Sequence, residues 1–443
     1  MTTEAISKPC QIRVSVLALL AAGSVFAALP QVSNVNVDSS APKRVTVSYV
    51  LANAPAIITV DFRTNGVSIG EANFTTLSGD VNKKVSGNGS HALTWNARAD
   101  WPNRRVPAFS AVVTAWPLAN PPDYMVASLS VESNVCYYVS TNALPGGLAD
   151  PVYATTNLVM RLVHARGVPW QQGGLRDPGQ TLSYGYGQTV VLDADYYIGI
   201  YPVTQRQFMM VSGGQRRGYF YTNPYRRPVE NVSYNEIYCN AVGTHTNPSA
   251  DTYMYPNPPN PNSWLGRLRK FTGFDFDLPS ELQWEYAARS GTCDGYWNDG
   301  TPSYTASDAS CPGRVRGNSS GCVLNPETGK YVEPASNVAP ENGGTAIVGS
   351  YNPSKWGIYD MHGNVCEFCH DFAGSSMTKH RGKVNANGLV DLDGTARTSR
   401  MRRGGCWYFT AADHAEAYKR VDEIDCSQPA KYNGFRVVCP ITR

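Results

Sequence analysis

The sequence has few charged residues and no run of basic ones. Charged side chains make up 16% of its 443 residues, well under the usual quarter, and the formal net charge is +3. The basic pairs Arg226-Arg227 and Arg402-Arg403 are only two residues long, and clusters of this length are usually solvated surface. We therefore expect no nucleic-acid partner, because proteins that bind nucleic acids concentrate lysine and arginine.

The sequence also lacks an apolar run long enough to span a bilayer. Its first apolar run, Val14 to Phe26, is short, follows Lys8 and Arg13, and ends at small residues around Ala27. This pattern predicts a signal peptide over residues 1–27, with an uncleaved anchor as the alternative. We expect an exported protein, periplasmic, secreted or on the cell surface, with no membrane span.

Cysteine is absent from residues 30–120, and short alternating segments fill this region instead. Arg44–Val50 and Ala56–Phe62 resemble strands, and Thr64-Asn-Gly66 resembles a turn. We expect a multidomain chain that begins with an all-β, immunoglobulin-like sandwich over residues 30–120, acting as a spacer or adhesion module. A connector, 121–156, and a second domain, 157–443, would follow.

Two capping boxes predict helices in the second domain. Ser233-Tyr-Asn-Glu236 opens one, and Ser280-Glu-Leu-Gln283 opens another with Trp284, Ala287 and Ala288 facing inward and Gly291 as its stop. Long segments rich in proline and asparagine surround them. Much of this domain is therefore expected to be irregular surface backbone, where binding residues usually lie.

The run from Trp356 to Asp371 combines buried-type aromatic residues with acidic ones. Asp360 and Glu367 are oxygen donors seven residues apart, and a Gly-Asn turn between them exposes backbone carbonyls. This is the chemistry of a calcium loop. The alternative is a core strand with a tight turn whose carboxylates make ordinary hydrogen bonds.

Four further segments accompany this run in a fixed order, and together the five resemble the sulfatase-modifying-factor family, that of the formylglycine-generating enzyme. The resemblance covers about 280 residues, from about Asn157 to the C-terminus. It implies an α+β C-type-lectin-like fold rich in irregular loops. The four segments are Tyr197–Thr204, Pro228–Ser233, Leu278–Arg289, and Arg403–Trp407 followed by Gly434–Arg436.

The resemblance also implies structural calcium and one disulfide. The ligands at the first calcium site would be the side chains of Asp360 and Glu367 and the carbonyls of Gly363 and Val365. A second site would begin at Asn337-Val338. The family disulfide would join Cys239 to Cys439.

The copper chemistry of the family's oxidases does not carry over to this sequence. Those enzymes hold copper(I) with two thiolates, and the corresponding positions here are Phe409 and His414. Phenylalanine cannot bind a metal, and imidazole suits copper(I) less well than thiolate. Copper is therefore not expected, although a Cys406/His414 pair can be imagined. Cys366-Glu-Phe-Cys369 lacks the context of a zinc knuckle or a redox motif, so packed or disulfide-bonded cysteines are expected there.

The stretch after the Arg-Gly-Gly motif mixes rigid aromatic side chains with polar ones, as binding surfaces do. In lectin-like members of the family this stretch displays the residues that contact ligand, and the alternative is an ordinary solvated loop. The candidate ligand-binding residues are Trp407, Tyr408, Phe409, Asp413, His414, Tyr418 and Arg420.

Three functions remain open on the sequence. The first is a calcium-stabilised binding module for an unknown protein, peptide or glycan ligand, without copper oxidase activity. The second is a formylglycine-generating-type oxidase or a related non-haem metal oxygenase that acts on a thiol. The third is a structural surface-layer or cell-wall component with no specific ligand.

Overall fold

The computed structural model describes residues 28–441 apart from 42, 103–107, 174–187, 221–223, 249–252, 254, 256, 292–312, 317–322, 325–330, 333–343, 373–397, 410–414 and 418. The predicted signal peptide, 1–27, lies outside the described residues. Within them, no helix combines the length and the apolar character needed to cross a membrane.

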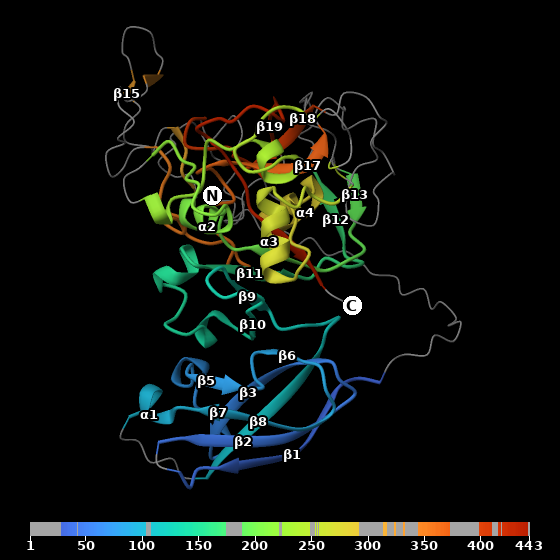
Figure 1. Cartoon of the computed structure of the whole chain (residues 1–443), viewed down its shortest axis with the longest axis vertical. Helices are drawn as coiled ribbons and strands as arrows, with labels where there is room; N and C mark the ends of the chain where they lie inside the picture. The colour runs from blue at the N-terminus through green and yellow to red at the C-terminus, as the bar shows by residue number, and fades with distance from the viewer. Residues whose placement is uncertain are drawn as a thin grey trace, which may run out of the picture.

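Two antiparallel sheets form the N-terminal region (Figure 1, blue). In one, the order is β1 (Gln31–Asp38), β2 (Val45–Ala52), β7 (Gly89–Trp95) and β5 (Leu77–Gly79). The other contains β4 (Val67–Ser68), β3 (Ala56–Thr64), β6 (Lys83–Val85) and β8 (Phe109–Pro117), which pairs with β3.

One apolar core lies between these sheets. Strand β2 alternates buried and more exposed residues, which gives it one inward face. Trp95 and Phe62 lie at the centre, with ring centroids 4.8 Å apart. The all-β sandwich is thus present, and its immunoglobulin-like topology stays a prediction.

A five-stranded sheet begins the second region. Its order is β10 (Val135–Tyr138), β9 (Tyr124–Ser128), β11 (Asn157–Val163), β14 (Tyr196–Gly199) and β21 (Val438–Pro440). Strands β9 and β10 belong to residues 121–156, expected to be a connector. The prolines at 121 and 122 lead directly into β9, so the second region's sheet starts at Tyr124. Tyr137 on β10 donates its N–H to Asn82 of the sandwich at 2.8 Å, and the two regions therefore touch.

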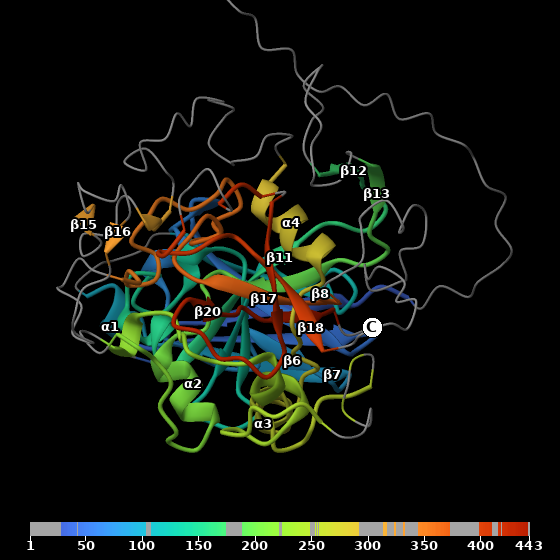
Figure 2. The same cartoon turned by 90° about the horizontal axis from the view of Figure 1, so that it is seen from above.

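A four-stranded sheet carries the residues of greatest functional interest. Its order is β19 (Arg420–Asp425), β18 (Ser399–Arg403), β17 (Cys366–Phe372) and β20 (Asn433–Gly434). Phe368 on β17 packs in the core that contains residues of α2 (Gln205–Val211) and α3 (Trp264–Thr272). Cys369 packs on the other side, with α4 (Glu281–Arg289). Figure 2 shows α4 and the α2–α3 pair on opposite sides of β17.

The predicted capping box of Ser280 is confirmed. The Ser280 hydroxyl accepts the N–H of Gln283, and the side chain of Gln283 accepts the N–H of Ser280. Trp284, Ala287 and Ala288 are fully buried, as predicted. The helix ends at Ser290, which has φ 47°, one residue before the expected stop at Gly291. The box at Ser233 opens a π-helix, η5 (Asn235–Cys239), in place of an ordinary α-helix.

The remaining elements are short. They are α1 (Ala97–Asp100), β12 (Pro169–Gln172), β13 (Gln188–Val191), β15 (Val323–Leu324), β16 (Tyr331–Val332), and the 3-10 turns η1 (Glu71–Asn73), η2 (Thr141–Ala143), η3 (Pro151–Ala154) and η4 (Pro224–Arg226).

Candidate functional site

The turn before β17 is held tightly against the segment after β18. Gly363 donates its N–H to the carbonyl of Gly404 at 2.6 Å, and Trp407 donates its N–H to Asn364 at 3.1 Å. Gly363 has φ 105°, and a Cβ there would lie 2.3 Å from the carbonyl oxygen of Arg314. Only glycine fits this position, so the turn fixes where Asp360 and Glu367 point.

Asp360 suits a cation better than Glu367 does. Asp360 is buried, accepts the N–H of Gly349 at 2.8 Å, and burial raises its pKa to about 6. Glu367 already faces a cation, because Arg436 donates Nε to Oε2 at 2.6 Å and Nη2 to Oε1 at 2.8 Å. Trp284 adds a bond to Oε2 at 2.6 Å.

Of the four predicted calcium ligands, at Asp360, Gly363, Val365 and Glu367, the last already binds Arg436, and the calcium site stays a prediction. An ion beside Glu367 would compete with a bidentate guanidinium in a site closed to water. Among the described residues, no three His, Cys, Asp or Glu side chains gather as a metal-binding group. The second predicted site, at Asn337-Val338, lies outside the described residues.

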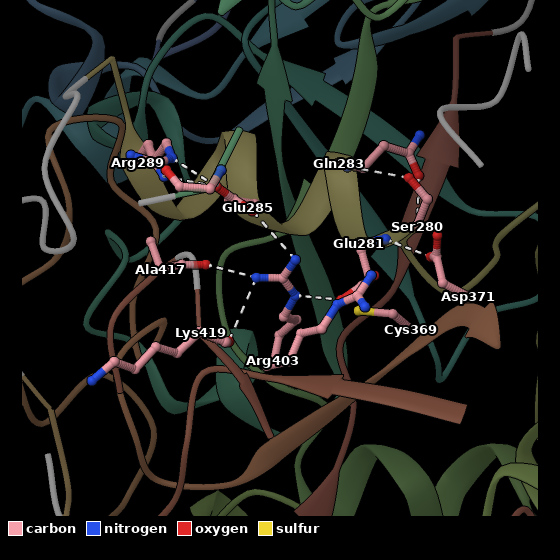
Figure 3. A network of polar contacts seen from close by, with 12 residues as sticks. Ser280, Glu281, Gln283, Glu285, Arg289, Cys369, Asp371, Arg403, Ala417 and Lys419 are labelled. Atoms are coloured by element: carbon pink, nitrogen blue, oxygen red, sulfur yellow. Dashed lines mark hydrogen bonds and ion pairs between the residues drawn. The ribbon is translucent and has the colours of Figure 1, made fainter. Parts of the chain in front are cut away.

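A buried ionic network lies between α4 and β18 (Figure 3). Arg403 donates Nε to Oε1 of Glu281 at 2.8 Å, and its Nη2 lies 3.3 Å from Oε2 of Glu285. Arg289 contacts Glu285 at 2.7 Å, and Arg420 donates Nε to Glu281 at 2.9 Å. All four carboxylate and guanidinium groups of Glu281, Glu285, Arg403 and Arg289 are almost fully enclosed.

Charge pairing decides the protonation states in this network. Burial alone would raise the pKa of Glu281, but Arg403 and Arg420 hold it below its ordinary value. Asp371, which accepts the N–H of Glu281 at 2.6 Å, has its pKa raised to about 7 by burial and by the nearby charge of Glu281. Arg420, predicted to contact ligand, is thus committed to a structural ion pair.

Three half-buried rings, Tyr408, Phe409 and Tyr432, form what we call the aromatic cluster. Tyr408 and Tyr432 stack at 5.6 Å between ring centroids, and Phe409 lies 5.4 Å from Tyr432. Three cations flank the cluster: Arg316 lies 4.9 Å from the Tyr408 ring, the Lys431 ammonium lies 5.1 Å from the same ring, and Arg402 lies 5.6 Å from the Tyr432 ring. Rings and cations in this arrangement favour each other electrostatically.

The other predicted ligand-binding residues divide into two groups. Trp407 is buried, packs edge-on against Phe220 at 4.9 Å, and supports the aromatic cluster from below. Asp413, His414 and Tyr418 lie outside the described residues. Lys431 and Tyr432 close the same sequence stretch as Tyr408, but their contacts with it were not predicted. Sequence reasoning missed Arg316, because it comes from a distant segment of the chain.

Cys239 and Cys439, the predicted disulfide partners, are free thiols in the structure, as Cys366 and Cys406 are, and their neighbours differ. Cys439 lies opposite Tyr197 in the strand pair β14–β21, and its charged neighbours are Asp275, Arg269 and Asp277. Cys239 instead lies near Cys426, whose carbonyl accepts the N–H of Asn235 at the start of η5. The offset of Cys439 along the sequence thus carries it away from η5.

A second thiol pair, which the sequence reasoning did not foresee, lies beneath the aromatic cluster. Cys366 and Cys406 are both fully buried free thiols, and their side chains pack in one small cluster with Val421. Cys369, three residues further along β17, faces the opposite side of the strand, toward Trp284 and α4. The two cysteines of the C-x-x-C pattern therefore do not face each other.

Comparisons with known proteins agree with this architecture. Residues 170–441 match the family model described as a sulfatase-modifying factor enzyme 1-like domain. "Chaperone protein LppX" of Paenibacillus barcinonensis is 30% identical over 277 residues, covering 58% of this chain and 85% of that protein. "Serine/threonine-protein kinase pkn1" of Chlamydia pneumoniae is 39% identical over 64 residues, covering 14% of this chain and 10% of that protein.

Two solved structures align with 64% of the chain, each with a TM-score of 0.45. Treponema denticola variable protein 1 is 22% identical and is covered to 96% of its length. PvdO from Pseudomonas aeruginosa is 19% identical and is covered to 94%.

Proposed function

We propose that this chain, which belongs to the sulfatase-modifying-factor family, is an exported ligand-binding protein without copper oxidase activity. The observation that carries this proposal concerns Phe409. It stands where the family's oxidases hold a copper thiolate, and its ring packs against Tyr432 at 5.4 Å. The position has thus become part of a hydrophobic cluster.

The chemistry of the aromatic cluster supports a peptide or protein ligand over a glycan. Its rings are rigid and half-buried, so they offer apolar area at a small entropic cost. Arg316 and Lys431 add positive charge at its edge. Aromatic and acidic side chains of a partner complement such a surface. The name of the Paenibacillus relative, a chaperone protein, also favours a protein partner.

Binding can be tested on peptide and glycan arrays. We expect the protein to bind peptides with acidic and aromatic residues, and the double variant Tyr408→Ala/Tyr432→Ala to bind them at least about tenfold more weakly, since each ring supports the other. Tyr225→Ala is a matched control, because Tyr225 is 49% exposed and is not part of the aromatic cluster. Silent peptide arrays, or equal loss in the control, would contradict the proposal.

The alternative function, an oxidase that converts a substrate cysteine to formylglycine, draws on the thiols of Cys366 and Cys406. Thiolates are the ligands that copper(I) prefers. Catalysis would also need an open position for substrate, and both thiols are fully enclosed. We expect no mass change in a Cys-x-Pro-x-Arg peptide incubated with the protein, copper and oxygen. Conversion of that peptide would restore the oxidase reading.

A further inference from the structure

Cys366 and Cys406 are brought together from positions 40 residues apart in the sequence. Cys366 is the first residue of β17, and Cys406 follows the end of β18. Their side chains form one buried cluster with Val421, directly below Tyr408, Phe409 and Tyr432. Both thiols are fully shielded from water and lie in one three-residue cluster, so each has the other as its cysteine partner there.

Backbone hydrogen bonds fix the segments that carry both cysteines. Glu367 pairs with Arg403 in the β17–β18 ladder, and Gly363 bonds to Gly404 beyond it. Cys366 also donates its own N–H to Tyr432 at 2.7 Å. The β17–β18 ladder, continued by one residue, places Gly404 opposite Cys366, and Cys406 follows two residues later. The two side chains meet in the same buried cluster, so a bond would join groups that already pack together.

We propose that Cys366 and Cys406 form a disulfide that fastens the aromatic cluster's segment to β17. The oxidant is a small-molecule disulfide such as oxidised glutathione. One cysteine thiolate attacks it and releases one glutathione thiol, and the second cysteine then displaces the other. The two cysteines lose two electrons and two protons in total. These reduce one molecule of oxidised glutathione to two molecules of reduced glutathione.

The burial of the pair decides when the bond forms. In the folded protein neither sulfur can be reached by a glutathione molecule, and burial raises the pKa of the Cys366 thiol. The bond therefore forms while the chain folds, and the folded dithiol protein reacts slowly. Cys369 cannot replace Cys366, because it lies on the opposite side of β17.

Peptide mapping of the full chain tests the inference. The reduced protein is refolded with reduced and oxidised glutathione, alkylated, and digested with trypsin without reduction. We expect peptide 356–379, which contains Cys366 and Cys369, to be linked to peptide 404–419, which contains Cys406. Cys366→Ser abolishes this link, and the matched control Cys369→Ser retains it. Oxidised protein should melt about 5–10 °C above the Cys366→Ser variant, as closing a loop of this length predicts.

Three results would overturn the inference. Both thiols could be alkylated in full at every glutathione ratio, or the link could survive in Cys366→Ser and disappear in Cys369→Ser. Stoichiometric copper or zinc that protects both thiols from alkylation would assign them to a metal instead. None of these results depends on whether the aromatic cluster binds a ligand, so the disulfide and the proposed function fail separately.

Discussion

The two regions of this molecule are built on different physical principles. The N-terminal sandwich encloses an apolar core, in which Trp95, Phe62, Phe74 and Phe109 make ring contacts. Its ion pairs lie near the surface. In the pair of Arg63 with Asp61, the two side chains are 40% and 29% exposed. The second region buries whole ion pairs, including Arg436–Glu367 and Arg403–Glu281.

This difference determines how each region responds to mutation. An apolar core loses stability in proportion to the volume removed, independently of pH. A buried ion pair is nearly balanced while complete, but a single removal leaves an enclosed charge without a partner. The second region should therefore be far more sensitive to changes of one charged residue than the sandwich is.

The largest expected effect comes from Arg436→Met. The change removes the guanidinium that neutralises the buried carboxylate of Glu367; of the hydrogen-bond donors described above, Trp284 remains. The second region should therefore lose about 3–5 kcal/mol of unfolding free energy. Urea unfolding measures this loss. In the sandwich, Arg63→Met should cost at most about 1 kcal/mol. Equal losses of unfolding free energy in Arg436→Met and Arg63→Met would contradict the contrast between the two regions. If Arg436→Met/Glu367→Leu recovers part of the lost stability, the unpaired charge of Glu367 accounts for the loss.

Trp95→Ala tests the apolar region. Trp95 is 1% exposed, so its truncation should cost the sandwich about 3–4 kcal/mol through lost burial and an unfilled cavity. Calorimetry at pH 5 and at pH 8 should give the same loss, while the transition of the second region stays in place. A loss that changed strongly with pH would show that charges contribute to the sandwich core as well.

Asp371→Asn should produce a smaller, pH-dependent effect. The pKa of Asp371 is raised to about 7 in the folded state against an ordinary value of 3.8, so the folded state holds more protons between these pH values. Stability contributed by this group is present below pH 4 and is lost as pH rises toward 7. The variant cannot lose that proton, so its stability relative to the parent should rise by about 2–3 kcal/mol between pH 5 and pH 8. Chemical unfolding at several pH values measures the difference, and parallel curves would contradict it.

Features of the fold that depend on residues close together in the sequence could be predicted, and features that depend on contacts between distant segments could not. The helix after Ser280 and the strands near Val45 and Ala56 follow from local signals of capping and alternation, and they were predicted. The Cys366–Cys406 contact and the role of Tyr432 arise from pairing between distant segments, which local patterns do not encode. The neighbours of the predicted Cys239–Cys439 pair also depend on distant segments, because β21 pairs with β14 and η5 lies beside Cys426; that disulfide stays a prediction.

The smallest expected effect concerns calcium. It tests whether Arg436 or a metal ion neutralises Glu367 in the second region. If Arg436 is the cation that neutralises Glu367, chelator should shift the melting temperature of the second region by less than about 2 °C. An ion bound at a hundredfold excess over its dissociation constant would contribute about 2.7 kcal/mol and shift it by several degrees. Asp360→Ala and Asp360→Asn separate the two cases in scanning calorimetry with and without calcium. A melting transition that responds to chelator in the parent but not in Asp360→Ala would contradict this expectation. Glu367 would then bind calcium in place of the Arg436 guanidinium, which would support the predicted calcium loop.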